Sequence, residues 1–217
     1  MTQSQTRTQT CILSNDTLIK LPTHKFYRQT FLFEELLSIL LWAVTRISYD
    51  VKCLIDGSRG MAIQPSGGWD RGTIRLLTIA TLQIRGEERV QQIDCLTKQI
   101  PTYLLPDSAV IQTDTNLICR EPRQVNGILK ELKEEVQIAC AEMTDFVKPT
   151  RLGYPTIEFL EPGKEWRQAQ MRLDMDMSFV SDRAYDENGQ PRDAAIARDM
   201  TPLGEMYISP LQSLPPQ

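Results

Sequence analysis

Two carboxylates separated by one residue, Asp174 and Asp176, are the first candidates for chemistry in this chain. Residues two apart on a strand point to the same face, so this pair could share a divalent cation. The same spacing is also typical of the solvated face of an antiparallel strand. Because no third acidic residue, glycine-rich loop or histidine accompanies the pair, we favour the solvated face and predict no metal site.

The tripeptide Asp50-Val51-Lys52 is a second candidate, because it follows a predicted helix and is similar to the acid-x-lysine step of metal-dependent nucleases. Such nucleases also need an upstream strand aspartate and a helix glutamate in fixed geometry. Neither companion can be identified in the sequence. We therefore keep a nuclease that uses Asp50 and Lys52 as one alternative function.

Other familiar catalytic and cofactor patterns are weak in this sequence. The single histidine, His24, has no cysteine or aspartate at a recognisable spacing, and the five cysteines form no CxxC pair. The glycines of 57–60 and 67–68 precede predicted strands rather than helices, so we interpret them as turns and not as phosphate loops. Alternating methionines at 171, 175 and 177 indicate packing. We predict a protein without catalytic residues or cofactor.

Charge and hydropathy limit the partners and the location. A net charge of -4 and an isoelectric point near 5.2 argue against a protein that grips nucleic acid over a wide basic surface. The N-terminus is polar and lacks the apolar core of a secretory signal. The longest apolar stretch, 31–44, contains two glutamates and is shorter than the roughly 20 residues that span a bilayer. These features predict a cytosolic protein.

The elements that would position these residues follow from periodicity. Helical spacing predicts helices over 30–47, 87–100 and 125–143, and alternation predicts strands over 49–55, 61–63, 69–84, 110–119, 156–159 and 166–179. The turns between them predict one hairpin of 49–55 with 61–63 and a final hairpin of 156–159 with 166–179. The expected fold class is α+β, with a small, mainly antiparallel sheet flanked by two or three helices. We expect an N-terminal arm over 1–25, one domain over 26–180 and a flexible C-terminal tail over 181–217.

Some apolar side chains exceed what one sheet face and one helix face require. Leu77 and Ile79 lie on the second face of the strand 69–84, and Trp42 lies outside the main apolar stripe of the first helix. Either the domain itself or a neighbouring subunit must cover them. A set of spare apolar residues without a catalytic set favours a subunit of an assembly; a cytosolic binding or regulatory module is a further alternative.

The order of these elements resembles the tail terminator proteins of long-tailed bacteriophages and related contractile particles. In that family a first helix precedes a small sheet, a tryptophan-led strand feeds directly into a helix, and a Trp-x-x-Ala strand closes the domain. The matching residues are Trp69 with the strand to Ile84 and the helix 87–100, and Trp166-Arg167-Gln168-Ala169 with the strand to Phe179. The resemblance covers about residues 30 to 180 and departs from small family members at both ends and around 101–123.

The resemblance implies a homo-oligomeric ring, usually a hexamer, in the virion. Such a ring sits on the last tail-tube ring, stops growth of the tube or sheath, and joins the tail to the head connector. DNA would pass through its lumen without specific binding. On this hypothesis the interface residues are Trp42, Leu77, Ile79, Trp69 and Trp166, the lumen residues are Asp174 and Asp176, and the two ends order on neighbours. A head-closure, tail-completion or sheath-capping subunit would fit the same pattern.

Overall fold

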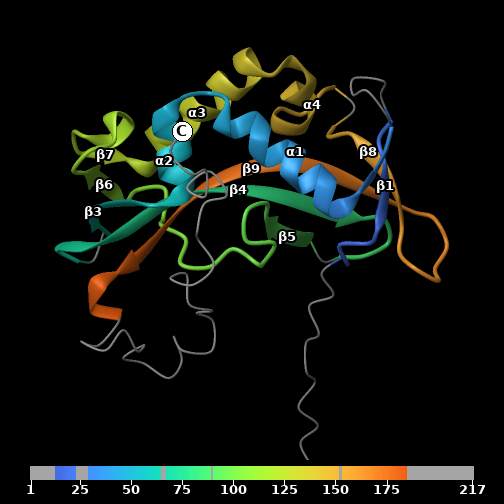
Figure 1. Cartoon of the computed structure of the whole chain (residues 1–217), viewed down its shortest axis with the longest axis horizontal. Helices are drawn as coiled ribbons and strands as arrows, with labels where there is room; N and C mark the ends of the chain where they lie inside the picture. The colour runs from blue at the N-terminus through green and yellow to red at the C-terminus, as the bar shows by residue number, and fades with distance from the viewer. Residues whose placement is uncertain (1–12, 23–28, 65–66, 89, 152, 185–217) are drawn as a thin grey trace, which may run out of the picture.

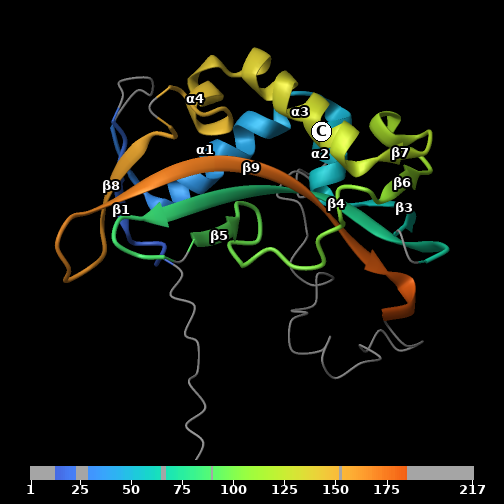
Figure 2. The same cartoon turned by 180° about the vertical axis from the view of Figure 1, so that it is seen from behind.

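A computed structural model describes residues 13–22, 29–64, 67–88, 90–151 and 153–184 of the chain. In these residues nine strands form one antiparallel sheet, and the α-helices lie together on one of its faces (Figures 1 and 2). The strand order is β2-β1-β8-β9-β4-β3-β6-β7, with β5 paired to β4. The predicted α+β class with a mainly antiparallel sheet is confirmed.

The elements have the following bounds. The helices are α1 (Phe33–Thr45), α2 (Tyr49–Asp56), α3 (Val125–Ala139) and α4 (Thr144–Val147). The strands are β1 (Leu18–Lys20), β2 (Thr30–Leu32), β3 (Ser58–Ile63), β4 (Trp69–Ile84), β5 (Val90–Asp94), β6 (Val110–Thr113), β7 (Arg123–Gln124), β8 (Thr156–Leu160) and β9 (Arg167–Ser181).

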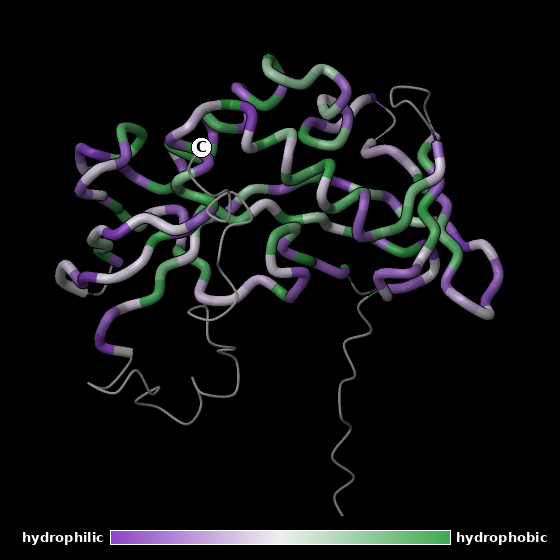
Figure 3. Tube along the Cα trace, viewed as in Figure 1, coloured by the Kyte–Doolittle hydropathy of each residue, from purple (hydrophilic) through white to green (hydrophobic). Residues whose placement is uncertain are grey.

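The centre of the sheet is the long ladder between β4 and β9, which runs from Gly72 opposite Ser181 to Ile84 opposite Ala169. One face of this ladder packs under the helices and belongs to the main core, which includes Ile74, Leu76, Ala80, Leu82, Met171, Leu173, Met175 and Met177. The methionines therefore pack, as predicted. Figure 3 shows hydrophobic stretches along the central strands, whereas the loop between β8 and β9 is hydrophilic.

The predicted strand over 49–55 is wrong, because these residues form the helix α2. Ser48 caps the helix, since its hydroxyl accepts the N–H of Val51 at 3.2 Å. The buried residues Val51, Leu54 and Ile55 follow helical spacing. Leu54 was the residue that broke the alternation. The strand that follows, β3, consequently pairs with β4 and β6 rather than in a hairpin with 49–55.

The predicted helix over 87–100 is also wrong. Gly86, with a φ of +86°, turns the chain back after β4, and β5 then pairs with β4 from Val90 to Asp94. After Asp94 a tight turn returns the chain, because Lys98 donates its N–H to the carbonyl of Asp94 at 2.8 Å. A neighbouring strand edge thus overrides the helical spacing of residues 90, 93 and 96–97.

The remaining elements are close to expectation. The predicted helix over 30–47 is α1, preceded by the short strand β2, and the predicted strand over 69–84 is β4. The predicted helix over 125–143 is α3, followed by a short 3₁₀ turn, and the predicted final hairpin is β8 and β9. The predicted strand over 110–119 is shorter, since β6 ends at 113 and a 3₁₀ turn covers 117–119.

The ends of the domain differ from the predicted boundaries. Residues 18–20, inside the predicted arm 1–25, form β1 between β2 and β8, and Ile19 and Leu21 are fully buried. Strand β9 continues to Ser181, one residue into the predicted tail. His24 and most of both predicted terminal segments lie outside the described residues.

Candidate functional site

All three tryptophans of the chain lie on the surface. Trp42, on α1, is 56% exposed; Trp69, the first residue of β4, is 43% exposed; and Trp166, just before β9, is 49% exposed. Tryptophan is usually well buried in a lone domain and is enriched in the energetic centres of protein interfaces. Three exposed tryptophans are therefore the most distinctive surface feature of the described chain.

Leu77 and Ile79 do not share this surface, because they are only 3% and 2% exposed. They lie on the face of β4 that points away from the helices. We call this face of β4 and β9 the open face, because no helix of the described residues packs on it (Figures 1 and 2). The chain from Cys95 to Leu105 crosses it. The Cys95 N–H donates to the Thr78 carbonyl, on the side of β4 away from β9, and the Leu105 N–H donates to the Met177 carbonyl, on the side of β9 away from β4.

The prediction that Leu77 and Ile79 are free for a neighbouring subunit is consequently corrected. The domain covers both residues itself, which was the other possibility left by the sequence. Figures 1 and 2 show this covering segment and β5 on the side of the central strands opposite the helices. Of the five predicted interface residues, only the three tryptophans are exposed.

The two candidate metal ligands lie on the open face and have separate partners. Thr81 Oγ1 donates to Asp174 Oδ2 at 2.7 Å, and Arg172 Nε lies 2.7 Å from the same oxygen. Asp176 Oδ1 accepts the backbone N–H of Met177 at 2.8 Å. Burial raises the pKa of Asp176 above its ordinary value, more than this hydrogen bond lowers it. Within the described residues, no three histidine, cysteine or carboxylate side chains gather as metal ligands.

The residues of the nuclease alternative lie on α2 instead of a strand. The Asp50 carboxylate accepts the N–H of Leu117 at 3.0 Å, and its backbone carbonyl accepts the side-chain amide of Asn116 at 2.7 Å. Asp50 thus fixes the turn after β6 against α2. The strand placement that made Asp50 and Lys52 comparable to an acid-x-lysine step is absent, so the alternative loses its geometric basis.

A buried ion pair that the sequence pattern does not reveal holds β5 against the rest of the domain. Arg75 and Asp94 approach to 3.5 Å, and their side chains are only 10% and 3% exposed. Arg75 Nε also donates to the carbonyl of Ile55 at the end of α2, at 3.2 Å. Arg75 therefore links β4 to both α2 and β5. The available signal was a single charge inside the apolar run 74–82.

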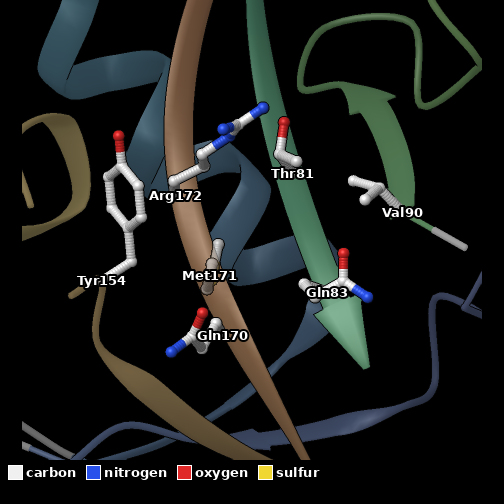
Figure 4. A pocket seen from close by; sticks show the side chains of 7 residues that line it. All are labelled: Thr81, Gln83, Val90, Tyr154, Gln170, Met171 and Arg172. Atoms are coloured by element: carbon white, nitrogen blue, oxygen red, sulfur yellow. The ribbon is translucent and has the colours of Figure 1, made fainter. Parts of the chain in front are cut away.

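A pocket of about 180 Å³ lies on the open face, where β4, β5 and β9 run side by side. Figure 4 shows its lining residues, Thr81, Gln83, Val90, Tyr154, Gln170, Met171 and Arg172. The guanidinium of Arg172 lies 5.9 Å from the centre of the Tyr154 ring. Amides, a hydroxyl and a guanidinium offer both donors and acceptors here, so the pocket could hold a polar side chain of another segment.

No helix in the described part of the chain is long and apolar enough to cross a membrane. Comparisons of the sequence with protein-family models, and of the chain with curated proteins and solved structures, found no match.

Proposed function

We propose that this chain is a structural subunit that closes with copies of itself into a ring at the head-proximal end of a phage tail. In this role the ring ends growth of the tube or sheath and joins the tail to the head connector. The observation that carries the proposal is the exposure of all three tryptophans, two of them at the starts of the longest strands. Another neck or head-closure subunit would use the same surfaces.

The positions of Trp69 and Trp166 favour a ring over a two-fold dimer. Strands β4 and β9 are antiparallel neighbours, so the residues that precede them lie at opposite ends of the ladder. A strand of 16 residues spans about 50 Å at about 3.3 Å per residue. A head-to-tail, heterologous contact requires two different contact surfaces at opposite ends of a protomer. Such contacts generate a ring when the rotation from one protomer to the next returns to the first.

The element order supports the phage form of the proposal. As in the tail terminator pattern, α1 precedes the main strands and the domain contains two tryptophan-led strands, which pair with each other in this chain. This chain departs from that family pattern after β4, where the strand β5 replaces the expected helix. The tail-specific role therefore rests on the first helix and the paired strands, and no longer on 87–100.

The open face is the proposed lumen side of the ring. Asp174 is partly exposed there, and Asp176 lies on the same face two residues further along β9. Carboxylates repel the phosphate backbone, so DNA could slide past such a surface without sticking. The charge of Asp174 is offset by Arg172, whose Nε lies 2.7 Å from its carboxylate, and burial disfavours the ionised form of Asp176, so this pair supplies only weak repulsion.

Size-exclusion chromatography with light scattering on the full chain tests the proposal. We expect one species of several protomers, seen as rings by negative-stain electron microscopy. Trp69→Ala or Trp166→Ala should shift the chain toward monomer while leaving the unfolding midpoint of the monomer nearly unchanged, because each side chain is about half exposed. The matched control is Ile138→Ala, which removes an apolar side chain that is 85% exposed on α3.

Two results would count against the proposal. A wild-type chain that stays monomeric at every concentration would remove the ring. Assemblies that survive both tryptophan substitutions unchanged would show that these surfaces do not hold the ring together.

A further inference from the structure

Strand β5 has an outer edge that is not used inside the described domain. The bond from the Cys95 N–H to the Thr78 carbonyl shows that Cys95, and with it Ile93 and Gln91, directs its backbone groups toward β4. Val90, Gln92 and Asp94 therefore direct theirs outward. The backbone N–H and carbonyl of Asp94 are bonded to residues 99 and 98 in the turn that follows β5. Val90 and Gln92 are exposed and have no backbone partner among the described residues.

Two further observations place polar recognition at this edge. The side-chain oxygen of Gln91, Oε1, is buried without a hydrogen-bond partner among the described residues. The side chain of Val90, which is 49% exposed, lines the polar pocket of Figure 4 beside Gln83. A buried acceptor without a donor is costly, so an incoming segment that carries amide or hydroxyl donors would be favoured here.

The N-terminal sequence has the chemistry that this edge requires. In residues 2–10, TQSQTRTQT, threonine or serine alternates without exception with glutamine or arginine. Strict alternation with β-branched threonine is typical of a strand, and every side chain except that of Arg7 is an uncharged hydroxyl or amide. The segment has no proline and no acidic residue. It can therefore donate to Gln91 without placing a carboxylate near Glu88 or Asp174.

The C-terminal sequence fits less well. Residues 185–217 contain five acidic residues against two arginines, and their prolines confine the longer uninterrupted runs to 192–201 and 203–209, both of which would bring carboxylates next to Asp174. The choice between the two ends therefore falls on the N-terminal one.

We propose that residues 2–10 of a second copy of the chain add to the outer edge of β5 as an extra strand. The backbone groups of Val90 and Gln92 pair with the added strand, and a glutamine or Arg7 side chain from it enters the pocket beside Thr81 and Gln83. This inference rests on the proposed function, since it names the segment that locks one subunit of the assembly to the next. Edge addition of this kind is a common mode of peptide recognition.

Disulfide cross-linking between two different variants tests the inference on the full chain. One variant carries Gln92→Cys, the other Thr6→Cys or Thr8→Cys, and Cys11 and Cys53 are replaced by serine in all of them. Mixed under oxidising conditions, the two should form a cross-linked dimer at least about tenfold more than a mixture with Lys164→Cys, whose position lies in the β8–β9 turn, because docking raises the local thiol concentration.

A proline substitution gives an independent readout. Gln92→Pro removes an outward N–H, which an edge strand tolerates, so the domain should fold but lose the added strand and assemble less. The matched control is Gln92→Thr, which keeps the N–H and should assemble like the wild type.

The outcomes separate the two proposals. A third variant carries Gln92→Cys together with Thr6→Cys or Thr8→Cys. Cross-links that form within this chain, and none between the two single variants, would overturn the inference, because the segment would then cover its own β5. Assembly that persists after deletion of 2–10 and after Gln92→Pro would also overturn it, while the proposed function stands. A monomeric wild type would overturn the proposed function itself.

Discussion

Replacing Asp94 by alanine is expected to lower the free energy of unfolding strongly, because this buried carboxylate accepts several hydrogen bonds at once. Besides the ion pair with Arg75, it accepts the N–H of Leu96 and of Thr97, each at 3.3 Å, and the Thr97 hydroxyl at 2.8 Å. Its removal takes away the carboxylate that the buried Arg75 guanidinium faces, and it deprives two backbone donors of this acceptor. The substitution therefore disrupts both β5 and the start of the segment that covers the open face.

The size of the effect follows from burial. Breaking a buried ion pair by removing one partner costs about 3–5 kcal/mol. The exposed pair of Arg71 and Asp114 is a matched control, since its atoms are also 3.5 Å apart but its side chains are 67% and 57% exposed. Removing a partner from such a surface pair costs about 0–1 kcal/mol. Asp94→Ala should therefore lower the free energy of unfolding by several kcal/mol, and Asp114→Ala by less than about 1 kcal/mol.

Urea unfolding followed by circular dichroism, at one protein concentration for all variants, measures both values. A double-mutant cycle with Arg75→Leu adds a second check, because the two substitutions at the buried pair should be strongly non-additive. Equal losses for Asp94→Ala and Asp114→Ala, or additive losses at the buried pair, would refute the reasoning.

Two further predictions concern the β4–β9 ladder. Because burial raises the pKa of Asp176, its ionised form is disfavoured in the fold, so its contribution to stability is present below its unfolded pKa of about 3.9 and is lost as pH rises through the folded value. Asp176→Asn should therefore be more stable than the wild type at pH 7, with a gain that vanishes in urea melts at about pH 3.5; a gain that does not depend on pH would contradict this. Gly72→Ala should lower the free energy of unfolding by more than about 2 kcal/mol, because the added Cβ would lie 2.2 Å from a backbone carbonyl oxygen of β9. The control is Gly127→Ala on α3, where no atom lies within 4 Å of the added Cβ; it should raise the free energy of unfolding by up to about 1 kcal/mol. Thermal melts that rank the two variants in the opposite order would contradict the steric explanation.

The sequence predicts elements well where one periodicity dominates. Strand β4 is recovered from Trp69 to Ile84 because its alternation is long and ends in turn residues at both sides. Segment 49–55 fails because Val51, Cys53 and Ile55 alternate while Leu54 and the cap Ser48 support a helix. Segment 87–100 fails because helical spacing competes with a sheet edge that only the tertiary fold provides. Local patterns cannot report a partner strand that lies elsewhere in the chain.

The candidate surfaces divide in the same way. The apolar character of Leu77 and Ile79 is visible in the sequence, but their coverage depends on where the segment 95–105 passes. The buried pair of Arg75 and Asp94 escapes detection because its members join only when β5 pairs with β4. By contrast, the placement of Asp174 and Asp176 on one face of β9 needs only the strand period, whereas the partial burial of Asp176 depends on the tertiary fold.

The β4–β9 ladder also constrains how the protein is made. It joins a strand from the first half of the chain to the last described strand, so β4 lacks its longest partner strand until β9 has left the ribosome. Until then β4 is a long strand with apolar residues on both faces and one edge unpaired, which is an aggregation hazard during synthesis. Folding is therefore expected to be post-translational and slow, and a message truncated before residue 167 would yield an insoluble fragment rather than a smaller folded unit.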